Sequence, residues 1–274
     1  MSEPRPRLYR IEGIVLRRSD TGEADRILTL FTPERGKVHL LARGVRRPGS
    51  RLAGHVELLT HSTFLVVRTR GLDIVTQAQT RHAFPSLRAS LEQIAWGCYF
   101  AELLDRMLPE ESANLPAFQL LLEALQLLDE GAPPEPLARS YELHLLTVLG
   151  FRPQLSSCVG CQQELRAQEQ AFSALLGGVL CPRCRGEDLQ ARPLSLEAWK
   201  ALRYLQRSGL EEAARLQLQP GCREEIAGLL HRYIRVILEH ELHTAGFLEQ
   251  LHSHPRAMGE PEPGSRRPRE RGEG

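Results

Sequence analysis

No stretch of this 274-residue sequence approaches the ~18 consecutive apolar residues that a membrane-spanning helix needs. Residues 1–10 hold four charged groups and few apolar ones, so a secretory signal peptide is not expected there. Both absences favour a cytoplasmic protein without a membrane partner. Because the cytoplasm is reducing, the six cysteines are expected as thiols or metal ligands instead of disulfides.

The motifs of several enzyme classes are missing as well. The sequence contains no G-x-x-x-x-G-K-[ST] phosphate-binding loop and no G-x-S-x-G nucleophile elbow. His240-Glu241 begins the metalloprotease pattern H-E-x-x-H, but Thr244 stands where the second histidine is needed. The sequence therefore predicts no catalytic residues and a protein that is not an enzyme.

Aromatic residues are scarce, at 5% of the chain. Residues 1–81 hold only Tyr9, Phe31 and Phe64, all at positions expected in strand interiors. Such residues are typical of a packed core and not of a platform on which nucleic-acid bases stack.

Charge, by contrast, is concentrated in the first part of the chain. Residues 1–81 hold fifteen Arg and Lys against eight Asp and Glu, a net charge of +7, whereas residues 82–157 have a net charge of −6. Within this basic part, residues 35–56 contain no carboxylate. Six cations lie there, namely Arg35, Lys37, Arg43, Arg46, Arg47 and Arg51, and a polyanion is their expected partner.

Four of these cations lie in the segment 43–51, which Gly44, Pro48 and Gly49 keep from forming a continuous helix or strand. Arginine forks on such an exposed loop can bind phosphate oxygens bidentately. With few aromatic residues, binding is expected to be electrostatic, without base preference, and to accept single- and double-stranded DNA. A merely solvated run of charge is the alternative.

Two C-x2-C pairs, nineteen residues apart, are the strongest chemical signal. The four cysteines are Cys158, Cys161, Cys181 and Cys184. This spacing predicts one structural Zn²⁺ ion, because four thiolates close a tetrahedron and leave no open position for water. Four reduced cysteines in a loop, or a redox C-x-x-C, are the alternatives.

The hydrophobic pattern predicts an α+β protein with several domains. Period-two segments at residues 8–18, 26–32, 37–45, 56–69 and 72–82 predict five strands, the content of an OB-type β-barrel, in a domain spanning residues 1–82. Helical periodicity follows at residues 87–108, 115–130, 136–149, 196–206 and 223–242. These helices form a domain at 83–252 that the zinc module, residues 156–192, interrupts. Residues 253–274, rich in Pro, Gly, Arg and Glu, are expected to be a disordered tail.

Several of these segments resemble the RecO family of bacterial DNA repair proteins. The likeness lies in residues 22–32 (GEADRILTLFT), Gly36-Lys37 and residues 42–52 (ARGVRRPGSRL), and again in residues 149–153 (LGFRP) leading into the first cysteine pair. The motifs occur in the family's order and the likeness spans roughly residues 8–250.

The resemblance implies a recombination mediator without catalytic activity. Such a protein binds single- and double-stranded DNA, anneals complementary strands, and works with RecR to load RecA onto strands coated by single-strand-binding protein. It implies a place in the cytoplasm at the nucleoid and zinc at the four cysteines. The DNA contacts that it implies are Lys37, Arg43, Arg46, Arg47 and Arg51. A nucleic-acid-processing enzyme and a zinc-containing scaffold protein are the alternatives.

Overall fold

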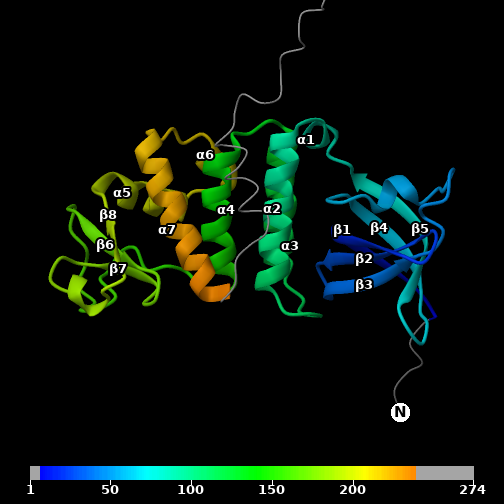
Figure 1. Ribbon diagram of the computed structural model, residues 1–274, viewed down its shortest axis with the longest axis horizontal. Helices are drawn as coiled ribbons and strands as arrows, with labels where there is room; N and C mark the ends of the chain where they lie inside the picture. The colour runs from blue at the N-terminus through cyan, green and yellow to red at the C-terminus, as the bar shows by residue number, and fades with distance from the viewer. Residues whose placement is uncertain (1–6, 239–274) are drawn as a thin grey trace, which may run out of the picture.

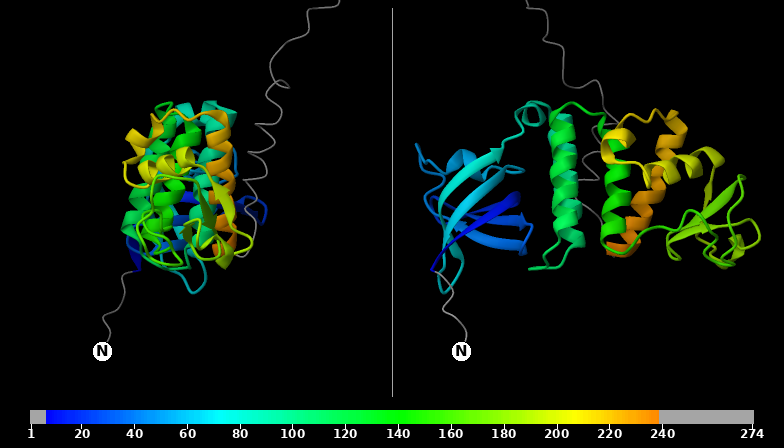
Figure 2. Two further views of the ribbon diagram at one scale, coloured as in Figure 1. Left: turned by 90° about the vertical axis from the view of Figure 1, so that its left-hand side faces the viewer. Right: turned by 180° about the vertical axis from the view of Figure 1, so that it is seen from behind.

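The computed structural model describes residues 7–238 of the chain. Three parts follow one another along its longest axis: a β-barrel, a group of helices, and a small three-stranded sheet (Figure 1). The view from behind shows the same order (Figure 2). The expected tail at 253–274 and His240-Glu241 lie outside the described residues.

Five strands close the barrel in the order β1-β2-β3-β5-β4. All neighbouring pairs are antiparallel except β3 with β5, so the barrel has the OB-like topology that the sequence predicts. The strands are β1 (Leu8–Thr21), β2 (Asp25–Thr32), β3 (Gly36–Ala42), β4 (His61–Val67) and β5 (Asp73–His82). Their alternating apolar residues fill the barrel, with Phe64 fully buried at its centre.

The third and fourth strands are shorter than the sequence pattern suggests. β3 ends at Ala42 and β4 begins at His61. Between them the chain forms turns and one short 3-10 helix, η1 (Ala53–Val56). Gly44 adopts a left-handed φ of 63° and donates its N–H to Asp25 Oδ1 at 2.7 Å, so the ladder stops where the glycine turns the chain.

Seven helices lie in the described part of the chain. They are α1 (Pro85–Ala89), α2 (Leu91–Met107), α3 (Leu115–Asp129), α4 (Pro134–Val148), α5 (Leu196–Leu205), α6 (Leu210–Ala214) and α7 (Pro220–Leu238). The helix expected at 87–108 is in fact two, because Ser90 is extended and its hydroxyl accepts the N–H of Gln93 to cap α2. None of these helices has the length and apolarity to cross a membrane.

The barrel and the helices share one hydrophobic core. Ile14, Leu16, Phe31 and Leu59 of the barrel part belong to the cluster of buried residues that fills the helical bundle. Phe31 and Phe118 of α3 lie with their ring centroids 6.1 Å apart. Gly36, with a φ of 67°, lies so close to Ser112 that a Cβ atom would overlap the Ser112 backbone. The two parts therefore fit together along a closely packed interface.

The cysteine-bearing segment lies at the far end of the bundle from the barrel (Figure 1). Its sheet has the order β7-β6-β8, formed by β6 (Gln170–Ser173), β7 (Gly178–Leu180) and β8 (Arg192–Leu194). A second 3-10 helix, η2 (Arg185–Glu187), follows Cys184. Because α4 precedes this segment and α5 follows it, the segment interrupts the helical part.

Candidate nucleic-acid interface and metal centre

The segment of residues 43–51, the arginine loop, connects β3 to the turn before η1. Arg43, Arg47 and Arg51 are exposed, and none of them forms an ion pair within residues 7–238. The backbone N–H of Arg46 donates to the Ala24 carbonyl at 2.9 Å, which holds the arginine loop against the β1–β2 turn. Three unpaired guanidinium groups are thus presented on a loop whose backbone is fixed by hydrogen bonds.

Arg46 differs from its neighbours because a carboxylate from another strand reaches it. Asp20, on β1, lies 3.3 Å from Arg46 Nε and 2.9 Å from Arg26 Nε. The hydrogen bond from Arg26 lowers the pKa of Asp20. Although no carboxylate lies near Arg46 in the sequence, Asp20 lies beside it in the folded protein. This ion pair is exposed and therefore weak, so a phosphate can compete with Asp20 for Arg46.

Lys37 does not lie with the arginines. It is 7% exposed, and its Nζ donates to the Asp105 carbonyl at 2.8 Å. The same Nζ pairs with Asp105 Oδ1 at 3.2 Å and with Glu110 Oε1 at 3.1 Å. Lys37 stays a prediction as a DNA contact, but its ammonium group is largely buried and already paired with two carboxylates, so the structure favours the arginines over it.

A groove of about 980 Å³ opens along β3 and the β4–β5 turn, and sequence reasoning missed it. The ring of Tyr9 carries two guanidinium groups, with Arg35 Cζ at 4.4 Å and Arg68 Cζ at 5.3 Å from its centroid. Its hydroxyl donates to Asp73 Oδ2 at 2.7 Å, and burial together with this carboxylate raises the pKa of Tyr9 to about 12. The groove is not a cationic site, because the carboxylates of Glu34, Asp73, Glu110 and Glu111 line it together with Arg35, Lys37 and Arg68.

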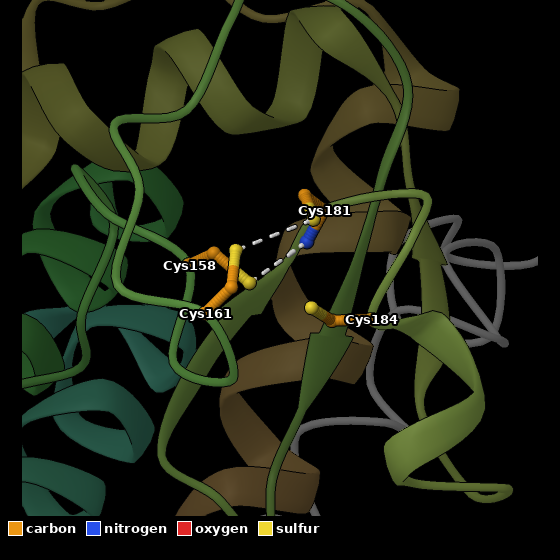
Figure 3. A group of neighbouring side chains, drawn as sticks. All are labelled: Cys158, Cys161, Cys181 and Cys184. Atoms are coloured by element: carbon orange, nitrogen blue, oxygen red, sulfur yellow. Dashed lines mark hydrogen bonds between the residues drawn. The ribbon is translucent and has the colours of Figure 1, made fainter.

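The four cysteines lie together at the base of the three-stranded sheet. Their sulfur atoms all lie within 4.8 Å of one another, and Cys161 Sγ and Cys181 Sγ are 3.9 Å apart. Figure 3 shows the side chains pointing toward a common centre. Sulfurs bound at about 2.3 Å around a tetrahedral zinc ion lie about 3.8 Å apart, so this group could hold such a metal ion.

The backbone around Cys158 favours a thiolate, whereas a hydrogen bond with Glu187 raises the pKa of Cys184. Cys181 donates its N–H to Cys158 Sγ at 3.3 Å. Burial raises the pKa of Cys158, but hydrogen bonds from the backbone of Cys181, Cys161 and Gly160 outweigh it and lower that pKa to about 6. N–H groups directed at a ligand sulfur provide an outer layer of support for a bound metal.

Comparison with known proteins places both halves of the chain in one family. Residues 6–84 match the family model described as Recombination protein O N terminal, and residues 88–245 match Recombination protein O C terminal. A protein of Roseiflexus sp. named DNA repair protein RecO is 46% identical over 90% of this chain and 87% of its own length. Proteins of the same name from Symbiobacterium thermophilum (39% identical) and Dehalococcoides mccartyi (36%) each match over 90% of this chain and 98% and 97% of their own lengths.

Proposed function

Because the chain belongs to the RecO family of DNA repair proteins, we propose that it binds single- and double-stranded DNA without base preference and anneals complementary strands. The observation that carries this proposal is the arginine loop, with Arg43, Arg47 and Arg51 exposed and without ion pairs in the described structure. Arg46 completes the proposed contact by exchanging Asp20 for a phosphate. Lys37 is left out, for the reason given above.

The physical mechanism is charge neutralisation. Two DNA backbones repel each other, and a cationic loop on a rigid barrel lowers that repulsion while leaving the bases free to pair. No proton transfer or covalent step is needed. The protein would therefore act by holding DNA and not as an enzyme.

The cysteine group serves a structural role in this proposal. Cys158, Cys161, Cys181 and Cys184 would hold one Zn²⁺ ion, whose closed set of four sulfur ligands leaves no place for a reacting water molecule. The ion would stabilise the small sheet, which has no apolar cluster of its own and shares that of the helical bundle.

The protein partners follow from the family. We propose that RecR and single-strand-binding protein are direct partners, that RecA is loaded indirectly, and that the protein works in the cytoplasm at the nucleoid. Because residues 82–157 have a net charge of −6, most of their surface would repel DNA and stay free for protein contacts.

Strand annealing with complementary oligonucleotides tests the proposal. The variant Arg43→Ala/Arg46→Ala/Arg47→Ala/Arg51→Ala should anneal at least tenfold more slowly, and the slope of log K against log salt on single strands should be shallower by about 3. The matched control removes four exposed arginines elsewhere, namely Arg166, Arg192, Arg215 and Arg223. It should retain annealing, because it changes the total charge by the same amount without touching the arginine loop.

Two results would favour the alternative functions. Unchanged affinity of the loop variant at low salt would favour a scaffold protein that does not use DNA. Cut or modified product after incubation of labelled strands with divalent metal ions would favour an enzyme. Metal analysis of the purified protein tests the zinc ion separately.

A further inference from the structure

A second cationic site lies far from the arginine loop. Where α5 ends and the chain leaves α4, the surface forms a pocket of about 180 Å³. Its lining contains three arginines, Arg152, Arg203 and Arg207, and no carboxylate. The other lining residues are Pro153, Gln154, Leu155, Ser156 and Gln206. We call it the three-arginine pocket.

None of the three arginines forms an ion pair within residues 7–238. This sets them apart from Arg215 and Arg223, which also lie on the helical part but pair with Glu211 and Glu135 at 2.5 and 2.8 Å. Three arginines that line one pocket without a carboxylate among the lining residues repel one another. Such an arrangement is stabilised when an anion enters.

Two of the arginines are held in place before any ligand binds. Arg203 lies over the ring of Trp199, with Cζ 4.7 Å from the centroid, and its Nε is buried without a hydrogen-bond partner. Trp199 is itself fixed, since its indole N–H donates to the Leu155 carbonyl at 2.9 Å. Arg152 donates to Gln206 Oε1 at 3.3 Å, and the Gln206 amide donates to the Pro153 carbonyl at 2.9 Å. An ordered guanidinium loses less conformational entropy when it binds.

The size and chemistry of the pocket indicate what enters it. A volume of about 180 Å³ suits a phosphate group and is small for a nucleotide with its base. Planar arginine forks match the oxygens of a phosphate bidentately. We infer that the three-arginine pocket binds a backbone phosphate of a second DNA strand.

The position of the pocket indicates that it binds a different DNA strand from the one on the arginine loop. The barrel lies at one end of the molecule and α5 beside the small sheet at the other, with α2, α3 and α4 between them (Figures 1 and 2). A DNA strand on the arginine loop and another on the pocket would be tethered to one molecule. Tethering raises the effective concentration of each strand for the other, which is what annealing requires. The inference rests on the proposed function, since it assumes that the barrel binds DNA.

The variant Arg152→Ala/Arg207→Ala tests it in the full-length protein. Both side chains are exposed and free of ion pairs, so the fold should be kept, and the thermal unfolding curve checks this. Arg203 is left in place because it covers Trp199. The control is Arg215→Ala/Arg223→Ala, which removes the same charge from paired arginines.

The readouts are annealing rate and the number of short oligonucleotides bound per protein at saturation. The pocket variant should bind its first oligonucleotide within twofold of the unaltered protein, lose the second, and anneal roughly tenfold more slowly. Unchanged stoichiometry and annealing would overturn the inference. The single change Arg207→Glu gives an independent check, because reversing the charge should reproduce the loss.

Failure of the inference and failure of the proposed function give different results. If the arginine-loop variant is impaired and the pocket variant is not, the proposed function stands and the pocket is not a DNA site. If both variants behave like the unaltered protein, the proposed function itself is wrong. If only binding of a labelled acidic peptide depends on Arg152 and Arg207, the pocket recognises a protein carboxylate and the inference is overturned.

Discussion

The two β-sheet parts of the molecule lie at opposite ends of the helical bundle and are stabilised in different ways. The barrel has strands of 7 to 14 residues that close on one another and enclose their own apolar cluster. The cysteine module has strands of 3 or 4 residues, and its buried residues all belong to the cluster of the helical bundle. Strand closure and an apolar cluster of its own stabilise the barrel, whereas the module, with its short strands, would gain most from a bound metal ion.

The difference in strand length indicates which part of the molecule a bound metal ion would stabilise. A three-stranded sheet of this length buries too little apolar surface to be stable alone. The four sulfurs come from the segment before β6 and the turn after β7, so a metal ion bound to all four would join these two segments. Zinc should therefore govern the order of the module and have little influence on the barrel.

The largest expected effect comes from removing the metal ligands. Cys158→Ser/Cys181→Ser should abolish binding of one Zn²⁺ ion, worth about 10–16 kcal/mol in small zinc modules, and unfold the module locally. Trp199 reports this, because its indole N–H bonds to Leu155 beside the module. In a Trp96→Phe background, its emission should shift to the red, while affinity for one DNA strand should stay within about twofold. Cys98→Ser serves as the control, and an unshifted spectrum after metal loss would contradict the comparison.

A smaller effect should follow from a change at the interface of the barrel with the helices. Phe31→Ala removes a fully buried ring that meets Phe118 and should lower the free energy of unfolding by about 4 kcal/mol. Phe64→Ala makes a similar cavity in the barrel's own cluster. Because the two clusters meet across one closely packed interface, urea unfolding of both variants should show a single transition shared by barrel and helices. Two separate transitions in Phe64→Ala would show that the barrel unfolds independently.

The smallest expected effect separates Lys37 from the arginines. Lys37→Ala leaves Asp105 and Glu110 without their shared cation and should cost about 2–3 kcal/mol in stability, since Glu110 is partly exposed to water. The salt dependence of single-stranded DNA binding by this variant should match that of the unaltered protein. Arg47→Ala should show the opposite pattern, with stability within ~0.5 kcal/mol and a salt slope shallower by about 0.7. Equal effects of both variants on the salt slope would show that Lys37 contacts DNA.

The barrel could be predicted from the sequence because its strands and turns are marked by residues close together in the chain. Alternating apolar residues and the turns at Gly36 and Gly71 determine where strands begin and end within a few residues. The break between α1 and α2 was missed, because the apolar periodicity continues on either side of Ser90. A signal was present, since Ser90 followed three residues later by Gln93 is a capping-box pattern.

The candidate interface was less predictable because it depends on residues distant in sequence. Nothing near Lys37 in the chain shows that Asp105 and Glu110 will enclose it, and nothing near Arg46 shows that Asp20 will approach from β1. The cysteine group is the exception. Its spacing alone predicts the convergence of four sulfurs, because two C-x2-C turns have few other stable uses.

The apolar surface that the barrel shares with the helices limits how the chain can be divided. A truncation after His82 would expose Ile14, Phe31 and Leu59 to water and leave Lys37 without its carboxylates. Such a fragment should self-associate, and its behaviour toward DNA would then report aggregation instead of recognition. A cut after α3 would in turn expose Phe100 and its neighbours, which pack on Tyr141 of α4, so a DNA-binding assay should use the full chain.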